Sequence, residues 1–272
     1  MADDRAAGRL ISADAALAAV LDAIATPTEP EWAYLSEAVG RVAAEDVTSA
    51  LDLPPWDNSA MDGYAIRHAD VAGARPDHPI LLEVVGDVPA GAESLPDVRR
   101  GTAVRIATGA RVPGGATAVV PVELTTPSGE ALGARGRDAT GPLPAAILVH
   151  EPVPDGGSIR RLGSDLRTGT TVHVAGSPVW PASIAVLAGA GQAGLLVHRQ
   201  PVVGILATGD EIRTPGANLG PAGIPDANGP ALHAYVAAAG GSGRAFGIAR
   251  DRIDDVRARI AAGLAAGPDA II

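Results

Sequence analysis

Acidic side chains stand in this sequence at points where apolar runs end. Asp210 and Glu211 lie in the turn, with Thr208 and Gly209, that follows an apolar run at 202–207, and Asp251 follows a second strand-like run at 244–248. In open parallel sheets, ligands bind beyond the carboxyl ends of the strands, so these carboxylates are expected on one rim. Asp251 has an alternative role as the N-cap of the following helix, and the two roles are compatible.

The segment Pro55–Ala65, PWDNSAMDGYA, is the most specific string in the chain. It combines two carboxylates, an amide and a hydroxyl, and it is flanked by proline and aromatic residues. Asp and Asn favour local turns, and Gly63 is expected to supply a positive φ for a tight bend. The pattern predicts a rigid polar loop at a surface or cleft, although a plain Asp-rich turn would also satisfy it.

Composition excludes several classes of protein. The chain has 272 residues, no cysteine and a net charge of −10. The missing cysteine rules out disulfides and thiolate sites, and the acidic balance argues against nucleic acid and anionic membranes as partners. No apolar run approaches the ~20 residues of a membrane span, and the acidic start does not resemble a signal peptide. We therefore expect a soluble, cytoplasmic protein.

Hydrophobic spacing predicts helices first and then a β-rich region. A helix is expected after Ser12 as N-cap, and a second, short helix is expected after Ser36. From about residue 49, short β-prone runs such as 80–85 and 118–122 alternate with turn residues, which favours a compact β domain. The Gly-rich stretch 127–144 is expected to be a surface loop or a long hairpin.

The last 70 or so residues predict an α/β arrangement. Strands at 202–207 and 244–248, a helix at 232–239 and a further strand at 269–272 imply a parallel sheet. The helix after Asp251 is expected to bury a stripe that runs from Ile253 to Leu264. Because the chain stops within a strand, we expect it to be a piece of a longer protein, the alternative being a complete three-strand unit.

Several strings, in order, resemble the MoeA and gephyrin E-domain family of molybdopterin molybdenumtransferases. They are PWDNSAMDGYA at 55–65, GDVPAG at 86–91, AVRIATGARVP at 103–113, IRRLGSD at 159–165 and VGILATGDE at 203–211. The resemblance implies insertion of molybdate into adenylylated molybdopterin, with release of AMP. It also implies a homodimer and an upstream molybdopterin adenylyltransferase that supplies the substrate.

The resemblance implies a multidomain α+β fold with three parts. Residues 1–48 and 166–200 would form a helical and extended dimerisation domain, and residues 49–165 an inserted β domain. Residues 201–272 would form the N-terminal part of a MogA-like α/β molybdopterin-binding domain with a parallel sheet. Because family elements that follow this point are absent, we expect the truncated chain to have impaired activity.

The resemblance also implies a site. Asp62, Glu211 and Asp251 are its catalytic candidates, and the cleft would lie between the α/β domain of one subunit and the β domain of its partner. A pyrophosphate-bearing substrate calls for a divalent cation, so Mg²⁺ is expected on Asp210, Glu211 and Asp251. The substrate-binding candidates are Ser59, Thr108, Thr208, Gly209, Asp226 and Asn228.

Three of these assignments leave alternatives open. Asn228 could cap the helix that follows it or present that helix's amides to an anion, and Thr108 could simply bond its own turn. Arg105 could supply positive charge to the cleft or be a solvated surface residue. For the whole chain, the alternatives to an enzyme are a non-catalytic scaffold and a molybdopterin-binding homologue; the retained carboxylates favour the enzyme.

Overall fold

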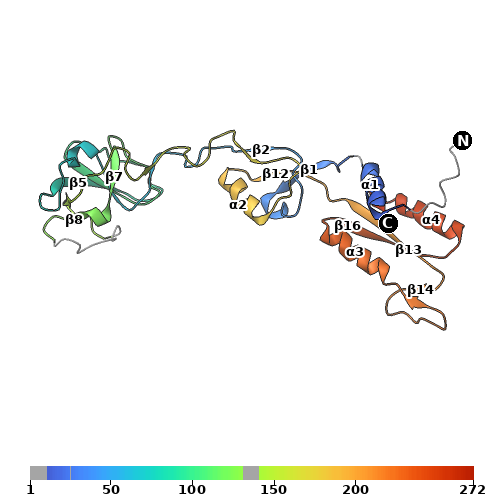
Figure 1. Cartoon of the computed structure of the whole chain (residues 1–272). Coiled ribbons are helices and arrows are strands. Elements are labelled where there is room, and N and C mark those ends of the chain that lie inside the picture. Colours follow the sequence, from blue (N-terminus) through green and yellow to red (C-terminus); the bar gives the residue numbers. More distant parts are fainter. Residues whose placement is uncertain (1–10, 25, 131–140) are drawn as a thin grey trace. The chain divides into compact units, whose positions relative to one another are not determined.

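The computed structural model describes residues 11–24, 26–130 and 141–272, and the chain forms two compact units of mixed α+β structure. Unit 1 contains Met1–Val47, His173–Ala188 and Ala193–Ile272, and unit 2 contains Thr48–Val172 and Gly189–Gln192. Figure 1 shows β5 and β7 in unit 2, and β13 and β16 in unit 1. The chain crosses between the units within β2 (Val47–Thr48) and β11 (Thr171–His173), and again on either side of Gly189–Gln192.

Unit 2 is built on a six-stranded sheet with the order β7-β4-β6-β5-β9-β8. Neighbouring strands are antiparallel, except that β5 and β6 are parallel. Alternate residues of β7 enter two different apolar clusters, Val120 with Ile66 and Leu82, and Val119 with Val104. The strands are β4 (Gly63–Ile66), β5 (Ile80–Val88), β6 (Thr102–Ile106), β7 (Ala118–Pro121), β8 (Thr125–Pro127) and β9 (Ala146–Val149).

The strands predicted at 80–85 and 118–122 are confirmed, with β7 ending one residue early. Short elements complete unit 2. The strand pair β3 (Asn58–Ser59) and β10 (Ile159–Arg160) is antiparallel, and the 3-10 helices are η2 (His68–Val71) and η3 (Val122–Leu124). β8 and β9 form the antiparallel arms on either side of the predicted loop or hairpin, of which residues 131–140 lie outside the described part of the chain.

The expectation for Gly63 is wrong. Its φ is not positive, because Gly63 is the first residue of β4 and is paired with Pro121 of β7. A Cβ at this position would lie 2.1 Å from the carbonyl oxygen of Val120. Glycine is required here because two backbones approach closely, not because the chain turns.

Unit 1 begins with helix α1 (Ala13–Ala23), which confirms the first predicted helix and its cap. The Ser12 side chain accepts a hydrogen bond from the Ala15 backbone N–H at 3.2 Å. None of the helix residues is buried, and the apolar residues of its stripe, Leu17 and Leu21 among them, are more than half exposed. The sequence therefore predicts the helix, but the chain itself does not cover its apolar face.

The second predicted helix is wrong. Only a 3-10 turn, η1 (Leu35–Glu37), follows β1 (Pro30–Tyr34), and the chain is then extended. The amides of Gly40, Ala43 and Ala44 bond to the carbonyl groups of Val179, Ser177 and Leu196. Because these amides have partners far along the chain, the local i to i−4 bonds of a helix do not form. β1 pairs antiparallel with β12 (Gly194–His198), and helix α2 (Pro181–Gly189) precedes β12 in the chain.

The α/β region of unit 1 has a parallel three-stranded sheet, as predicted. β13 (Val202–Thr208) is central, between β16 (Ser242–Ala249) and β17 (Ala270–Ile271). Figure 1 shows β13 and β16 between α3 (Asn228–Ala238) and α4 (Ile253–Leu264). A short parallel pair, β14 (Ile212–Arg213) and β15 (Ile224–Pro225), follows β13. Within the described residues, no helix is long and apolar enough to cross a membrane.

The predicted buried stripe of α4 is only partly observed. Val256 and Ile260 are half-buried, but Ile253 and Leu264 are more than half exposed. The buried residue of this helix is Gly263, where a Cβ would lie 2.0 Å from the Phe246 ring. Gly263 lies three and seven residues after Ile260 and Val256, so the three share one face of α4, and this face packs against the Phe246 ring of β16.

Candidate functional site

Asp62 and Thr108 meet at one edge of the unit 2 sheet. β4 starts at Gly63, directly after Asp62, and its antiparallel neighbour β6 ends at Ile106, two residues before Thr108. Oδ1 of Asp62 accepts hydrogen bonds from the backbone N–H of Thr108 at 2.7 Å and from its hydroxyl at 2.8 Å. The backbone bond, followed by the hydroxyl bond, lowers the pKa of Asp62 below its ordinary value. Asp62 is thus held as a carboxylate at neutral pH.

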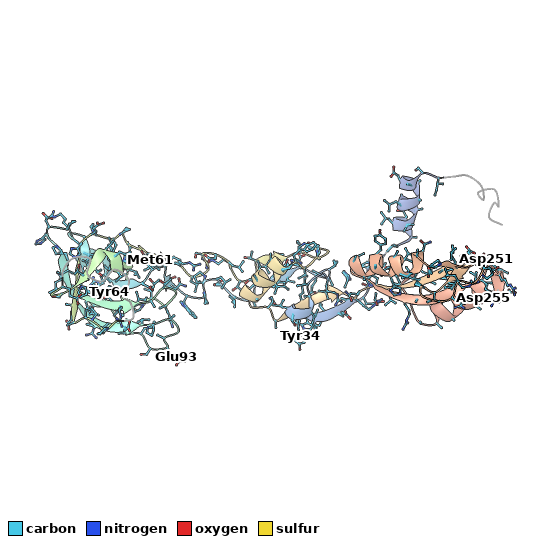
Figure 2. The ribbon with its side chains drawn as sticks, turned by 90° about the horizontal axis from the view of Figure 1, so that it is seen from below. Tyr34, Met61, Tyr64, Glu93, Asp251 and Asp255 are labelled. Atoms are coloured by element: carbon cyan, nitrogen blue, oxygen red, sulfur yellow. The ribbon has the colours of Figure 1, made fainter. Side chains whose placement is uncertain are left out.

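Ser59 belongs to the same segment as Asp62 and Met61 (Figure 2), but its hydroxyl is hydrogen-bonded within that segment. The Ser59 side chain is buried, and its Oγ donates to the Met61 carbonyl at 2.6 Å. The Ser59 backbone bonds to Gly109 and Ala110 on both sides. Ser59 therefore joins the loop to the turn after Thr108, and its contact with substrate stays a prediction.

Asp57 is a further carboxylate of this loop that sequence reasoning did not single out. Its Oδ2 accepts from Arg161 at 2.7 Å and its Oδ1 from the Leu162 amide at 2.8 Å. The amide bond, followed by the Arg161 bond, lowers the pKa of Asp57. Arg160 forms an ion pair with Asp165 in the same segment. In the sequence, these pairings were indicated only by the charged residues that occur in the strings at 55–65 and 159–165.

Arg105 is neither a free cation at the cleft nor a solvated surface residue. Only 8 % of the residue is exposed, and its guanidinium binds both oxygens of Asp87, at 2.9 and 2.8 Å. Burial and a bidentate ion pair make this one of the most constrained polar contacts of unit 2.

The rim of the parallel sheet in unit 1 brings Asp210 and Asp251 together. After β13 ends at Thr208, the Gly209 amide bonds to the Ala249 carbonyl at 3.0 Å. The Asp210 amide then bonds to Oδ2 of Asp251 at 3.3 Å. The Asp251 side chain is thus directed toward the neighbouring strand end, as expected for two loops on one rim.

The alternative role of Asp251 as a helix cap is wrong. The N-cap of α4 is Arg252, which makes no side-chain capping bond. Instead, the carboxylate of Asp255 accepts from the Arg250 amide at 2.6 Å. Figure 2 labels Asp251 and Asp255, both in the α/β region. Asp255, and not Asp251, therefore accepts the hydrogen bond from the backbone before α4, and the Asp251 carboxylate bonds to the Asp210 amide at the rim.

Glu211 lies beside Gly209 on the same rim. A Cβ on Gly209 would lie 3.0 Å from Oε2 of Glu211, and Gly209 has a φ of +145°. Glycine at this position therefore leaves room for the Glu211 carboxylate and allows the backbone to bend. Among the described residues, no three His, Cys, Asp or Glu side chains form a group that could hold a metal ion by themselves.

A pocket of about 220 Å³ opens at the end of β13 and the start of α3. Three of the predicted substrate-binding residues line it, namely Thr208, Asp226 and Asn228. Asn228 does not cap α3, because the N-cap is Ala227 and the Gly229 amide bonds to Oδ1 of Asp226 at 2.8 Å. The remaining lining residues are Ile205, Leu206, Ala207, Ile212, Gly229 and Leu232.

The predicted site residues therefore form two groups, each within its own unit. Ser59, Asp62 and Thr108 belong to unit 2, whereas Thr208 to Glu211, Asp226, Asn228 and Asp251 belong to unit 1. Each group lies where strands of a sheet end or begin.

Comparison with known proteins gives consistent matches. The family model for the MoeA N-terminal region (domain I and II) matches residues 11–191. Molybdopterin molybdenumtransferase 2 of Mycobacterium tuberculosis (strain ATCC 25618 / H37Rv) is 40% identical over 219 residues, which is 80% of this chain and 50% of that protein. The molybdopterin molybdenumtransferase of Bacillus subtilis (strain 168) is 34% identical over 226 residues, 83% of this chain and 50% of that protein.

A solved structure extends the match through the α/β region. The molybdopterin biosynthesis MoeA protein of Pyrococcus horikoshii OT3 has a TM-score of 0.83 and 32% identity, and the match covers 97% of this chain and 66% of that chain. The chain spans about half the length of the curated relatives it matches.

Proposed function

Because the chain belongs to the MoeA family, whose N-terminal region it carries, we propose that it acts in molybdenum cofactor biosynthesis as part of a molybdopterin molybdenumtransferase. The proposed reaction inserts molybdate into adenylylated molybdopterin and releases AMP. The observation that carries the proposal is the Asp62–Thr108 contact. It joins two of the family-matched strings, 46 residues apart, at one sheet edge and keeps a carboxylate ionised there.

In the proposed chemistry, water cleaves the phosphoanhydride of adenylylated molybdopterin and AMP leaves, while the two dithiolene sulfurs replace molybdate oxygen, which leaves as water with the thiol protons. Asp62, an ionised carboxylate beside Thr108, suits a hydrogen-bond acceptor toward the substrate, and its lowered pKa makes it a weak base. The pocket at Thr208, Asp226 and Asn228 suits a neutral, donor-bearing part of the substrate. The polar side chains of Thr208, Asp226 and Asn228 line it, and the Asp226 carboxylate already accepts a hydrogen bond from the Gly229 amide at the start of α3.

We infer that Mg²⁺ takes part through the rim of unit 1. Asp210 and Asp251 are neighbours there, and Glu211 lies next in sequence. The described residues supply no complete three-ligand cage. Mg²⁺ in proteins is commonly held by one or two carboxylates, several waters and substrate phosphates, and Asp210 and Asp251 are the carboxylates that we propose for this role. When bound, such an ion would neutralise the pyrophosphate charge.

The proposal includes the finer architecture. Unit 1 would contain both a dimerisation domain and the MogA-like α/β domain, and the homodimer would place the α/β rim of one subunit against the β domain of its partner. Large apolar side chains that unit 1 leaves exposed support a protein contact. They include Leu17, Leu21, Ile24, Trp32, Tyr34, Trp180 and Val186. An upstream molybdopterin adenylyltransferase would supply the substrate.

Release of AMP from adenylylated molybdopterin, with and without molybdate, tests the proposal. The assay compares this chain with the longer protein that carries its natural continuation. In the active form, Asp62→Ala and Glu211→Ala are each expected to lower the rate at least about 100-fold. Asp77→Ala is the matched control, since Asp77 is almost fully exposed and lies outside both groups. Full activity of both site variants would remove these carboxylates from the site.

Mixing subunits tests the shared cleft. In a heterodimer of an Asp62→Ala chain with a Glu211→Ala chain, one of the two shared clefts keeps both Asp62 and Glu211. Partial activity is therefore expected to return. Purified heterodimers that stay inactive would place the whole site within one subunit. A longer protein that dimerises but releases no AMP would support the scaffold alternative instead.

A further inference from the structure

The GDVPAG string at 86–91 has no role in the proposed chemistry, yet it lies at the sheet edge where Asp62 meets Thr108. β5 and β6 are parallel neighbours, so both end at the edge where antiparallel β4 begins. Asp87 and Arg105 are direct partners in the β5–β6 register. The third arm of the Arg105 guanidinium donates to the Gly141 carbonyl at 2.5 Å.

A β-bulge brings Asp87 into this register. The pairing of β5 with β6 shifts between Val84 and Gly86, so that one residue of β5 has no partner. Bulges commonly redirect a side chain. Gly86 is required there, because a Cβ would lie 2.5 Å from the side chain of Pro96. The bulge and the glycine thus set the carboxylate of Asp87 opposite the guanidinium of Arg105.

The next residues connect this ion pair to Thr108. Val88 and Ile106, which follow Asp87 and Arg105, are partners and are fully buried. The Val88 carbonyl then accepts from the Ala107 amide at 3.1 Å. Thr108 is the next residue, so its backbone continues from a residue that is hydrogen-bonded to β5.

We propose that Arg105 and Asp87 are positioning residues, whose ion pair holds the end of β6 so that the amide and hydroxyl of Thr108 meet Asp62. The importance of this geometry for catalysis rests on the proposed function, but the geometry itself does not. The pair acts through the backbone of residues 106–108.

The test measures Asp62 directly in the 272-residue chain. Carboxyl ¹³C NMR gives the pKa of Asp62, and hydrogen exchange reports on the Thr108 amide, in the parent and in Arg105→Met and Asp87→Asn variants. Both variants break the ion pair. Both are therefore expected to raise the pKa of Asp62 and to speed exchange at Thr108 about tenfold or more, the scale of one lost charge-assisted hydrogen bond.

Asp87→Asn separates positioning from simple electrostatics. If the charges of the pair acted on Asp62 through space, removal of the negative charge of Asp87 would lower the pKa of Asp62. If the pair instead positions Thr108, the pKa of Asp62 is expected to rise in this variant. A lowered or unchanged pKa in this nearly isosteric variant, with unchanged exchange at Thr108, would overturn the proposal.

Two controls address general loosening of the sheet. Leu82→Ala removes a buried side chain of β5 without touching the ion pair, and it is expected to leave the pKa of Asp62 unchanged. If the pKa of Asp62 rose as much in Leu82→Ala as in the ion-pair variants, the proposal would also be overturned. The exchanged pair Asp87→Arg with Arg105→Asp is expected to restore part of the Asp62 shift. All these readouts need no enzymatic turnover, so they stand or fail separately from the AMP-release assay.

Discussion

Replacement of Gly63 by alanine probes the closest backbone approach at the candidate site. The added Cβ would lie 2.1 Å from the Val120 oxygen and 3.0 Å from the Val120 carbon, both of them backbone atoms. Ordinary contact begins at 3.4 Å, so β4 and β7 must separate by more than 1 Å. Overpacking of this kind costs about 1–3 kcal/mol, and each ladder hydrogen bond lost adds about 1 kcal/mol.

Together these terms predict a loss of about 4 kcal/mol in the free energy of unfolding of unit 2, from which the lower chain entropy of alanine subtracts less than about 1 kcal/mol. Gly73→Ala is the matched control, since Gly73 has no neighbour within 4 Å and no positive φ. That control is expected to be neutral or stabilising by up to about 1 kcal/mol.

Urea denaturation followed by tryptophan fluorescence measures the effect locally. The chain has three tryptophans, and Trp56 is the one in unit 2, so a background with Trp32→Phe and Trp180→Phe reports on this unit. The midpoint should fall sharply in Gly63→Ala and not in Gly73→Ala. A Gly63→Ala protein within about 1 kcal/mol of its parent, with an unchanged m-value, would refute the packing argument.

Three further changes have defined outcomes. Thr108→Val removes the hydroxyl bond to Asp62 but keeps the larger backbone bond, so the pKa of Asp62 should rise by NMR and still stay below its ordinary value; full return to the ordinary value would contradict this ranking. Asp269 forms an ion pair with Arg199, whose Nη2 lies 2.7 Å from Oδ1, and this bond lowers the pKa of Asp269 to about 2. The ion pair is therefore fully stabilising above the ordinary pKa of a carboxyl and is lost as pH falls through about 2. The urea midpoint of Asp269→Asn should therefore be lower than the parent's at pH 7, and the two should converge near pH 2; a constant gap would count against the assignment. Ser12→Ala should weaken the start of α1 by about 1 kcal/mol, seen as faster hydrogen exchange at Ala15, and equal exchange would show that the cap contributes nothing.

The residues of the candidate site were readable from the sequence, but their contacts were not. The string at 55–65 singles out Asp62, and the string at 103–113 contains Thr108. Their contact depends on the register of β4 against β6, which is a pairing between segments about 40 residues apart. The same register decides that Arg105 faces Asp87 instead of solvent, because a bulge in β5 shifts the alignment.

Local interactions account for what the sequence by itself determined. The Ser12 cap, the helix that follows it, the strands at 80–85 and 118–122 and the parallel direction of β13, β16 and β17 were predicted from periodicity and turn chemistry among near neighbours. Tertiary structure decided the remainder. The residues after Ser36 are extended because their amides donate to carbonyl groups far along the chain. Glycine is needed at position 63 because the backbone of β7 leaves no room for a Cβ. Such features depend on which segments meet in space, and spacing along one segment carries no information about that.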